Sequence, residues 1–213
     1  MSVATRVKKR IEDKTTTAPR WRWYHGVAFY AIVQVLTFGL SGLTSAVSGN
    51  RGKNLRDNIF GNADYFRELK QSVFSPPSWV FAPAWTINNI LVIIGTWRVL
   101  NKSKDTPGRN TFLALQGASW INYTVFSAAY FSLRSPINAF VLTLSMFVLT
   151  ILSGLVAIFR LRDTWVALSL ATLFIWLTIA LTAATFQAAW NEDELYHAGP
   201  FVTPNKSLLK EVK

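Results

Sequence analysis

Long runs of apolar residues without a single charge alternate with short polar segments along this chain of 213 residues. A helix that crosses the hydrocarbon core of a bilayer needs roughly 20 such residues. The charge-free windows are residues 26–50, 71–97, 111–133, 135–159 and 164–191. They predict an all-α protein, an integral membrane bundle of five transmembrane helices over about residues 26–48, 76–98, 111–133, 136–159 and 164–190. Together these spans form one domain, residues 26–191.

Two polar segments flank the predicted domain. Residues 1–25 are basic and rich in threonine, and no apolar segment of signal-peptide length follows their first charges. We interpret them as a disordered tail beside the membrane, with Trp21, Trp23 and Tyr24 at the interface, where amphipathic rings are common. An organellar transit peptide is the alternative interpretation. Residues 192–213 are predicted to form a flexible tail.

The composition agrees with a membrane protein and narrows its partners. Hydrophobic residues make up 51% of the chain, with nine Trp and fifteen Phe, which is more than a typical soluble protein contains. The net charge is +11. In a protein of several spans, such a surplus of Lys and Arg usually holds loops on the cytoplasmic side. We therefore expect a lipid bilayer and no nucleic acid as partner, with the N-terminus in the cytoplasm. The membrane is either a bacterial-type cell membrane or an organellar membrane.

The segment that leads into the second span has a distinctive pattern of proline and tryptophan. It reads Phe74-Ser-Pro-Pro-Ser-Trp-Val-Phe-Ala-Pro-Ala-Trp-Thr86. Pro76 and Pro77 suit a first helical turn, because the N–H groups that they lack would have no partner there. Pro83 lies a full turn further in and removes a backbone hydrogen bond, so we predict a kink that makes room beside the helix. The freed carbonyl must then face protein or a cavity rather than lipid.

From Tyr65 to Thr86 the chain resembles, in register and without gaps, the pattern W-Y-x-x-L-x-K-P-x-W-x-P-P-x-W-V-F-[GA]-P-V-W-T of the TspO/translocator protein family. This family is also called the peripheral benzodiazepine receptor or tryptophan-rich sensory protein family. The resemblance is more diffuse over residues 111–190. It implies a five-helix membrane receptor, sensor or transporter that binds tetrapyrroles (porphyrin, haem) or sterol-like flat apolar ligands. It also implies a homodimer and a first loop that covers the ligand pocket.

Aromatic, amide and small residues on three of the spans are the candidate ligand-binding residues. They are Phe74, Trp79, Phe81, Pro83, Trp85 and Asn89 around the second span, Gln116, Trp120 and Tyr123 in the third, and Trp176, Ala180 and Ala184 in the fifth. Those of the third and fifth spans are carried over from the family pattern. Four of these candidates depart from that pattern: Asn89 replaces a Tyr, Ala184 replaces an Asn, Trp120 stands where Asn is usual, and Tyr123 stands where Trp is usual. The departure at Trp120 leaves the register of the third span open, and an interhelical hydrogen bond is the alternative role for Asn89.

The charge-free windows hold no Asp, Glu, Lys, Arg, His or Cys, and the whole chain has no cysteine. Acid–base, nucleophilic and metal chemistry inside the membrane therefore has no candidate residues there. We expect a protein that is not an enzyme, binds no metal and requires no cofactor, with porphyrin or haem as its ligand. A membrane scaffold without a ligand and a porphyrin-degrading enzyme are the alternatives.

Overall fold

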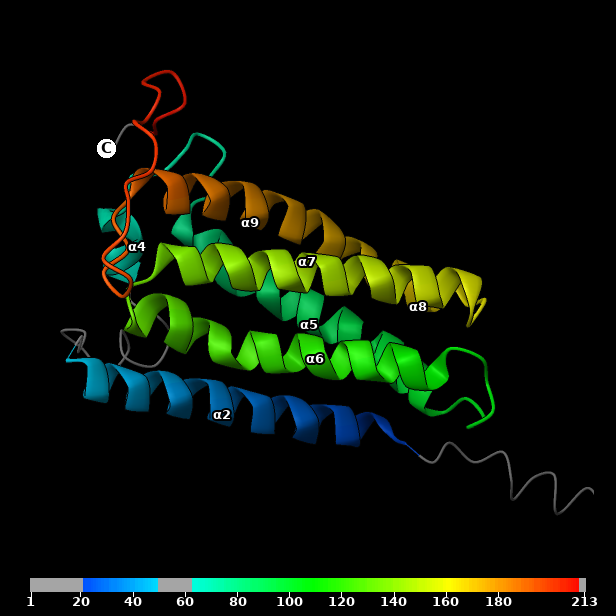
Figure 1. The fold of residues 1–213 in the computed structure, drawn as a ribbon. Helices are drawn as coiled ribbons and strands as arrows, with labels where there is room; N and C mark the ends of the chain where they lie inside the picture. Colours follow the sequence, from blue (N-terminus) through cyan, green and yellow to red (C-terminus); the bar gives the residue numbers. More distant parts are fainter. Residues whose placement is uncertain (1–20, 50–62, 211–213) are drawn as a thin grey trace, which may run out of the picture.

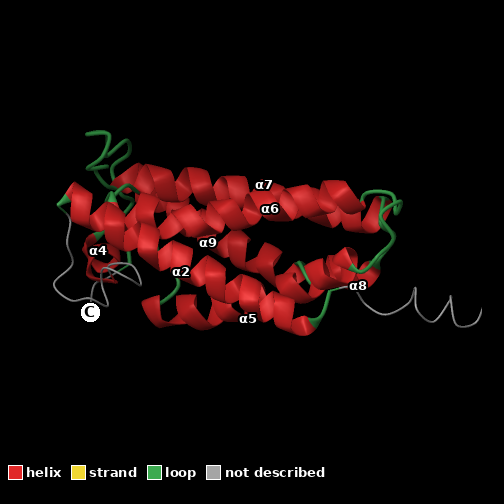
Figure 2. Cartoon of the chain, turned by 90° about the horizontal axis from the view of Figure 1, so that it is seen from below, coloured by secondary structure: helices red, strands yellow, loops and turns green. Residues whose placement is uncertain are grey.

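The structure, a computed structural model, describes residues 21–49 and 63–210 (Figure 1). The elements in this part of the chain are helices: α2 Trp23–Ser48, α4 Ala63–Glu68, α5 Ser78–Leu100, α6 Arg109–Ser127, the π-helix η1 Ala128–Ser132, α7 Pro136–Phe159, α8 Thr164–Leu168 and α9 Ala171–Trp190. The long helices lie side by side as one bundle, which Figures 1 and 2 show from two directions. The predicted all-helical class is confirmed.

Four helical segments are long and apolar enough to cross a membrane: Trp23–Ser48, Ser78–Leu100, Pro136–Phe159 and Thr164–Trp190. The chain is therefore an integral membrane protein that crosses the bilayer more than once. The predicted third span contains α6, which is less hydrophobic because it begins at Arg109 and carries Gln116 and Asn122. The count of five spans stays a prediction.

The ends of several helices differ from the sequence-based bounds. Residues 1–20 of the predicted N-terminal tail lie outside the described residues, but Trp23 already belongs to α2. Helix α5 begins at Ser78, after Pro77, and runs through Pro83 as one helix to Leu100. The predicted opening at Pro83 is therefore not seen as a break. Pro83 lies within the second turn, on the exposed side of α5, so the loss of one backbone hydrogen bond is tolerated.

A π-helical turn closes the third long helix. In η1 the Leu133 N–H donates to the Ala128 carbonyl at 3.1 Å, which is the i→i+5 spacing of a π-helix. This turn holds Ser132 against α2, where its hydroxyl lies 3.1 Å from the Ser41 hydroxyl and 2.8 Å from that of Ser45. Tyr130, within the same turn, is buried in the bundle.

Residues 192–210, which we expected to be a flexible tail, instead form a strap along the end of the bundle that also carries α4 (Figure 1). The Asp193 carboxylate accepts hydrogen bonds from the Ser135 hydroxyl at 2.6 Å and the Ile137 N–H at 3.0 Å. Further along, the Lys210 N–H donates to the Gln71 carbonyl at 2.8 Å. The strap thus ties the start of α7 to the segment that precedes α5.

Candidate functional site: an aromatic cavity in the bundle

The bundle encloses a cavity of about 420 Å³ that is lined from α2, α4, α5, α6, η1, α7 and α9. Its aromatic wall consists of Phe81 and Trp85 from α5, Tyr123 from α6 and Trp176 from α9. Phe81 meets Trp176 edge to face at 5.3 Å between ring centroids, and Trp85 meets Tyr123 at 5.4 Å. Edge-to-face contacts suit the ring quadrupoles and leave ring faces available to a flat ligand. The volume is in the range of small-molecule sites.

Helix α4 and η1 close one end of this cavity. Phe66 of α4 lines the cavity and meets Phe81 at 5.2 Å between centroids. The neighbouring Tyr65 is buried and packs against Tyr130 of η1 at 5.8 Å. The Arg134 guanidinium lies 4.4 Å from the centre of the Tyr65 ring and pairs with Glu68 and Glu194. Burial, helped by Glu194, raises the pKa of Tyr65 well above its usual value although Arg134 opposes the shift, so its phenol stays neutral.

Polar atoms are few in the cavity wall, and two N–H donors and the Thr37 hydroxyl have no hydrogen-bond partner among the described residues. The Tyr123 hydroxyl donates to the Gln34 side-chain oxygen at 3.3 Å, and the Tyr130 hydroxyl donates to the Gln187 side-chain oxygen at 3.0 Å. The indole N–H of Trp176 and the side-chain amide nitrogen of Gln187 are buried and have no hydrogen-bond partner among the described residues. Because an unpaired buried donor costs roughly 1–3 kcal/mol, this wall favours a ligand that brings acceptor oxygens.

The structure brings half of the predicted site residues to this cavity. Those that line it are Phe81, Trp85, Tyr123, Trp176, Ala180 and Ala184. Gln116 and Trp120, also in the predicted site, line a second cavity closer to the start of α6. Gln116, Trp120 and Tyr123 lie on one face of α6 but at successive positions along its axis. The first two therefore reach one cavity and Tyr123 reaches the other.

Four other predicted residues lie away from both cavities. Trp79 is 74% exposed on the outside of α5, and Pro83 is exposed as well. Phe74 is 53% exposed and stacks on Phe186 at 6.0 Å between centroids. Asn89 is buried within the bundle without lining a cavity. The Trp and Pro residues of the motif therefore divide between the inner and the outer side of α5.

Several cavity residues were not in the predicted site. They are Tyr30, Gln34, Thr37 and Phe38 of α2, Phe66 of α4, Phe126, Ser127, Tyr130 and Phe131 around η1, Ala139, Thr143 and Met146 of α7, Ser78, Ala82 and Thr86 of α5, and Ala183 and Gln187 of α9. A signal existed for Gln34, because it is an amide in the middle of an apolar span. Gln187 shares a helix face with Trp176 and Ala180, so helical spacing alone would have included it.

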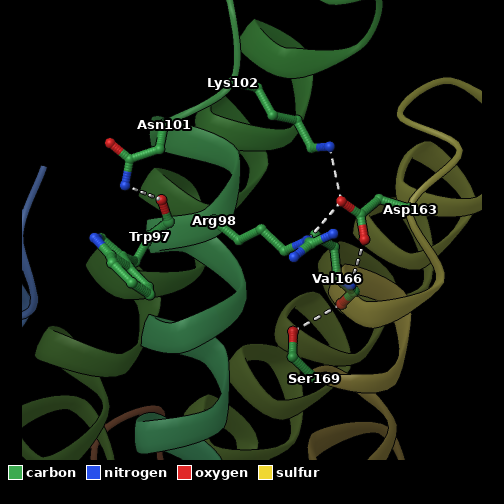
Figure 3. A network of polar contacts seen from close by, with 7 residues as sticks. All are labelled: Trp97, Arg98, Asn101, Lys102, Asp163, Val166 and Ser169. Carbon is green, nitrogen blue, oxygen red and sulfur yellow. Dashed lines mark hydrogen bonds and ion pairs between the residues drawn. The ribbon is translucent and has the colours of Figure 1, made fainter. Parts of the chain in front are cut away.

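At the opposite end of the bundle a buried carboxylate joins α5 to α8 (Figure 3). Asp163 is 5% exposed and pairs with Arg98 and Lys102, each at 2.7 Å. Its other oxygen accepts from the Val166 N–H at 3.3 Å and caps α8. Burial alone would raise the pKa of Asp163, but the hydrogen bonds from Lys102, Arg98 and Val166 lower it to about 2. The carboxylate therefore stays ionised and fastens the end of α5 to α8.

A glycine permits this close approach of α5 and α8. A Cβ at Gly95 would lie 2.0 Å from the Ser169 hydroxyl oxygen, which donates to the Val166 carbonyl at 2.7 Å.

No group of three or more His, Cys, Asp or Glu side chains suited to a metal ion occurs among residues 21–49 and 63–210. The side chains that line the aromatic cavity can therefore stack on a ligand and form hydrogen bonds with it.

Comparison with known proteins agrees with the pattern around α5. A model of the TspO/MBR family matches residues 31–191, which include most of α2 and all of the other helices that line the cavity. A tryptophan-rich sensory protein from Cereibacter sphaeroides is 28% identical over 134 residues, which are 62% of this chain and 80% of that protein. The strap at residues 192–210 follows the end of the family match.

Proposed function

Because this chain belongs to the TspO/MBR family, we propose that it is a receptor, sensor or transporter that binds a tetrapyrrole, such as porphyrin or haem, in the aromatic cavity. The observation that carries the proposal is the aromatic wall of Phe81, Trp85, Tyr123 and Trp176 together with two buried donors that lack acceptors. Flat aromatic ligands stack on such rings. The bilayer is the environment of this site, since the lining helices α2, α5, α7 and α9 are apolar enough to cross it.

The unpaired donors favour a tetrapyrrole over a sterol-like ligand. Biological porphyrins carry carboxylates, which are acceptors, whereas a sterol presents a single hydroxyl on an apolar skeleton. A carboxylate or carbonyl oxygen near Trp176 and Gln187 would satisfy groups that the protein leaves unpaired. A sterol-like flat ligand is the alternative occupant of the same cavity.

We propose binding without catalysis. The side chains that line the cavity are aromatic, aliphatic, amide and hydroxyl groups, and none of these types supplies a carboxylate, imidazole or thiol for acid–base or nucleophilic chemistry. A protein that degrades the bound porphyrin remains the catalytic alternative, and a scaffold without ligand is the structural one.

The proposal includes five membrane crossings, the third by α6 and η1 together. These two elements run from Arg109 to Ser132, 24 residues in sequence, which is long enough to span at about 1.5 Å per residue. They pack along both α2 and α7, two helices that meet the criteria for crossing. Two polar residues of α6 bond to α7: Gln116 donates to the Ser153 hydroxyl at 2.8 Å and Asn122 donates to the Leu142 carbonyl at 3.1 Å.

A homodimer and a cytoplasmic N-terminus complete the proposal. Both come from the sequence, the first by resemblance and the second from the distribution of Lys and Arg. Chemical crosslinking in membranes tests the dimer. A reporter fused after Lys213 tests the orientation, because activity restricted to the cytoplasm would reverse it.

Titration of the purified full-length protein with protoporphyrin, followed by the porphyrin absorbance band, tests the proposed ligand. The informative pair of variants is Trp85→Leu, inside the cavity, and Trp79→Leu, on the outside of the same helix. We expect Trp85→Leu to lower the affinity about tenfold, since stacking on one aromatic ring contributes roughly 1 kcal/mol or more, and Trp79→Leu to leave it unchanged.

The outcomes separate the alternatives. Saturable binding that depends on Trp85 supports the tetrapyrrole site. An absence of saturable binding supports the scaffold, and loss of intact porphyrin during incubation, measured by chromatography, supports degradation. Equal effects of the two variants would contradict the placement of the ligand in this cavity.

A further inference from the structure

A second cavity of about 310 Å³ lies between α2, α5 and α6, at the end of the bundle where α5 ends and α6 begins. It is lined by Trp21, Arg22, His25, Gly26, Phe29, Ile93, Thr96, Trp97, Leu100, Leu113, Gln116, Gly117 and Trp120. None of these residues lines the aromatic cavity described above. We propose that this is a separate ligand site for a small planar aromatic molecule that carries a hydroxyl group at one end and an anionic group at the other.

The planar class follows from the rings in the wall. Trp120 is buried and meets Phe29 edge to face at 5.1 Å between centroids, and Trp21 meets His25 at 5.5 Å. Together with Trp97 these residues place rings on all three helices that surround the cavity. The volume is at the lower end of the range for small-molecule sites, so a ligand of two or three rings suits it better than a macrocycle.

The hydroxyl group follows from the buried polar atoms. Gln116 is 3% exposed, and its amide nitrogen donates to the Ser153 hydroxyl at 2.8 Å. Its side-chain oxygen has no donor among the described residues, and the Thr96 hydroxyl is likewise buried without a partner there. A ligand hydroxyl can donate to the first and accept from the second. It would satisfy both groups, each of which is costly to leave unpaired in an apolar wall.

The anionic group follows from the charge at the mouth. Arg22 supplies a positive charge there, and the lining contains no carboxylate. The mouth is also held in place, because the Trp97 indole N–H donates to the Trp21 carbonyl at 2.6 Å and the Trp21 N–H donates to the Asn101 side chain at 2.9 Å. A preformed site needs less ordering on binding.

The test uses 6-hydroxy-2-naphthoate as probe and 6-methoxy-2-naphthoate as its partner without a hydroxyl donor. Energy transfer from tryptophan to the probe is measured on the full-length protein in lipid nanodiscs. We expect the hydroxy probe to bind the parent about tenfold more tightly than the methoxy probe, and the two to bind the Gln116→Met variant equally. Such a double comparison isolates the contact between the probe hydroxyl and Gln116.

Glycine variants keep the test valid if Gln116→Met folds poorly. A Cβ at Gly117 meets nothing within 4 Å, so Gly117→Leu starts from open space and adds side-chain volume at the cavity wall, and it should abolish saturable binding. Gly39 of α2 also has open space around it but lies outside both cavities, so Gly39→Leu is the matched control and should bind the probe like the parent.

Two results would overturn the proposal. One is equal binding of the hydroxy and methoxy probes to the parent. The other is binding that survives Gly117→Leu, and especially binding that is lost instead in Ala180→Leu, which would place the probe in the larger cavity. The porphyrin titration is independent of these measurements, so either site can fail without the other.

Discussion

The two cavities of this bundle share their aromatic character and differ in the polar atoms that they leave unpaired. The larger one presents two N–H donors, on Trp176 and Gln187, and the Thr37 hydroxyl, whereas the smaller one presents the side-chain oxygen of Gln116, an acceptor, and the Thr96 hydroxyl. Packed aromatic rings form a partition between the two cavities: Trp120, which lines the smaller one, meets Tyr123 at 5.6 Å and Tyr30 at 6.4 Å between centroids, and both tyrosines line the larger one. The aromatic walls are therefore alike in favouring flat ligands, and the unpaired atoms are what would distinguish the ligands of the two proposed sites.

The partition also explains why one helix serves both sites. Gln116 and Tyr123 are seven residues apart on α6, which is two turns or about 10 Å along the axis. They lie on one face and yet at different depths of the bundle. A stripe of polar and aromatic residues on one helix face therefore indicates which face is buried, but its residues can belong to two different cavities.

Blocking the larger cavity should give the largest difference between the effects on the two ligand affinities. Ala180 lines this cavity, so Ala180→Phe places a ring in the space that the porphyrin would take. We expect the affinity for protoporphyrin to fall roughly 100-fold, since overpacking costs up to about 3 kcal/mol. Binding of 6-hydroxy-2-naphthoate should stay within twofold of the parent. A parallel loss of both affinities would show that the cavities are one site.

Substitution of Asp163 tests how much its ion pairs with Arg98 and Lys102 contribute to stability. Its lowered pKa of about 2, against an ordinary value near 4, corresponds to about 2 kcal/mol of stability at neutral pH. Because the folded pKa lies below the unfolded one, this contribution is present above about pH 4 and is lost as the pH falls toward 2. Asp163→Asn should remove most of it at neutral pH.

Thermal unfolding of the purified protein between pH 6 and pH 2.5 measures this effect. The parent should lose its advantage over Asp163→Asn progressively below pH 4. A constant difference between the two proteins over this interval would contradict the role of the ionised carboxylate. Glu192→Gln, an exposed acid after α9, is the matched control and should follow the parent.

Trp176→Phe tests whether the unpaired indole N–H of the larger cavity contributes to porphyrin binding. It keeps a ring against Phe81 and Trp85 and removes the unpaired indole N–H. We expect about a tenfold lower affinity for protoporphyrin, from the loss of one buried hydrogen bond. Porphyrin methyl esters, which lack the charged carboxylates, should show a smaller difference between parent and variant. Equal losses for acid and ester would assign the effect to packing.

Pro83→Ala carries the smallest expected effect. Pro83 is exposed on an uninterrupted helix and lines neither cavity. We expect affinities for both porphyrin and naphthoate probes within twofold of the parent, measured by the same titrations. A clear loss of porphyrin affinity would restore the hypothesis that a kink at this proline opens the cavity.

The sequence by itself determined the class of the fold and the positions of its helices. Charge-free windows longer than 20 residues leave a chain few alternatives to membrane helices, because unpaired backbone groups are excluded from lipid. Local rules also predicted the start of α7 at Pro136, where the Ser135 hydroxyl accepts from the Asn138 N–H at 3.1 Å. The motif around α5 was sufficient to identify the family.

The tertiary structure alone decided which side of each helix faces a ligand. In a soluble helix, polar and apolar faces differ, but in lipid both the outer face and the interior are apolar, so Trp79 and Trp85 look alike in the sequence although one is exposed and the other lines the cavity. Contacts between segments that lie far apart in the chain also cannot be predicted from the pattern of apolar and polar residues. The hydrogen bonds of Asp193 and the contact of α4 with Arg134 through Glu68 join residues more than 50 positions apart. Such residues become neighbours only when the whole bundle has assembled.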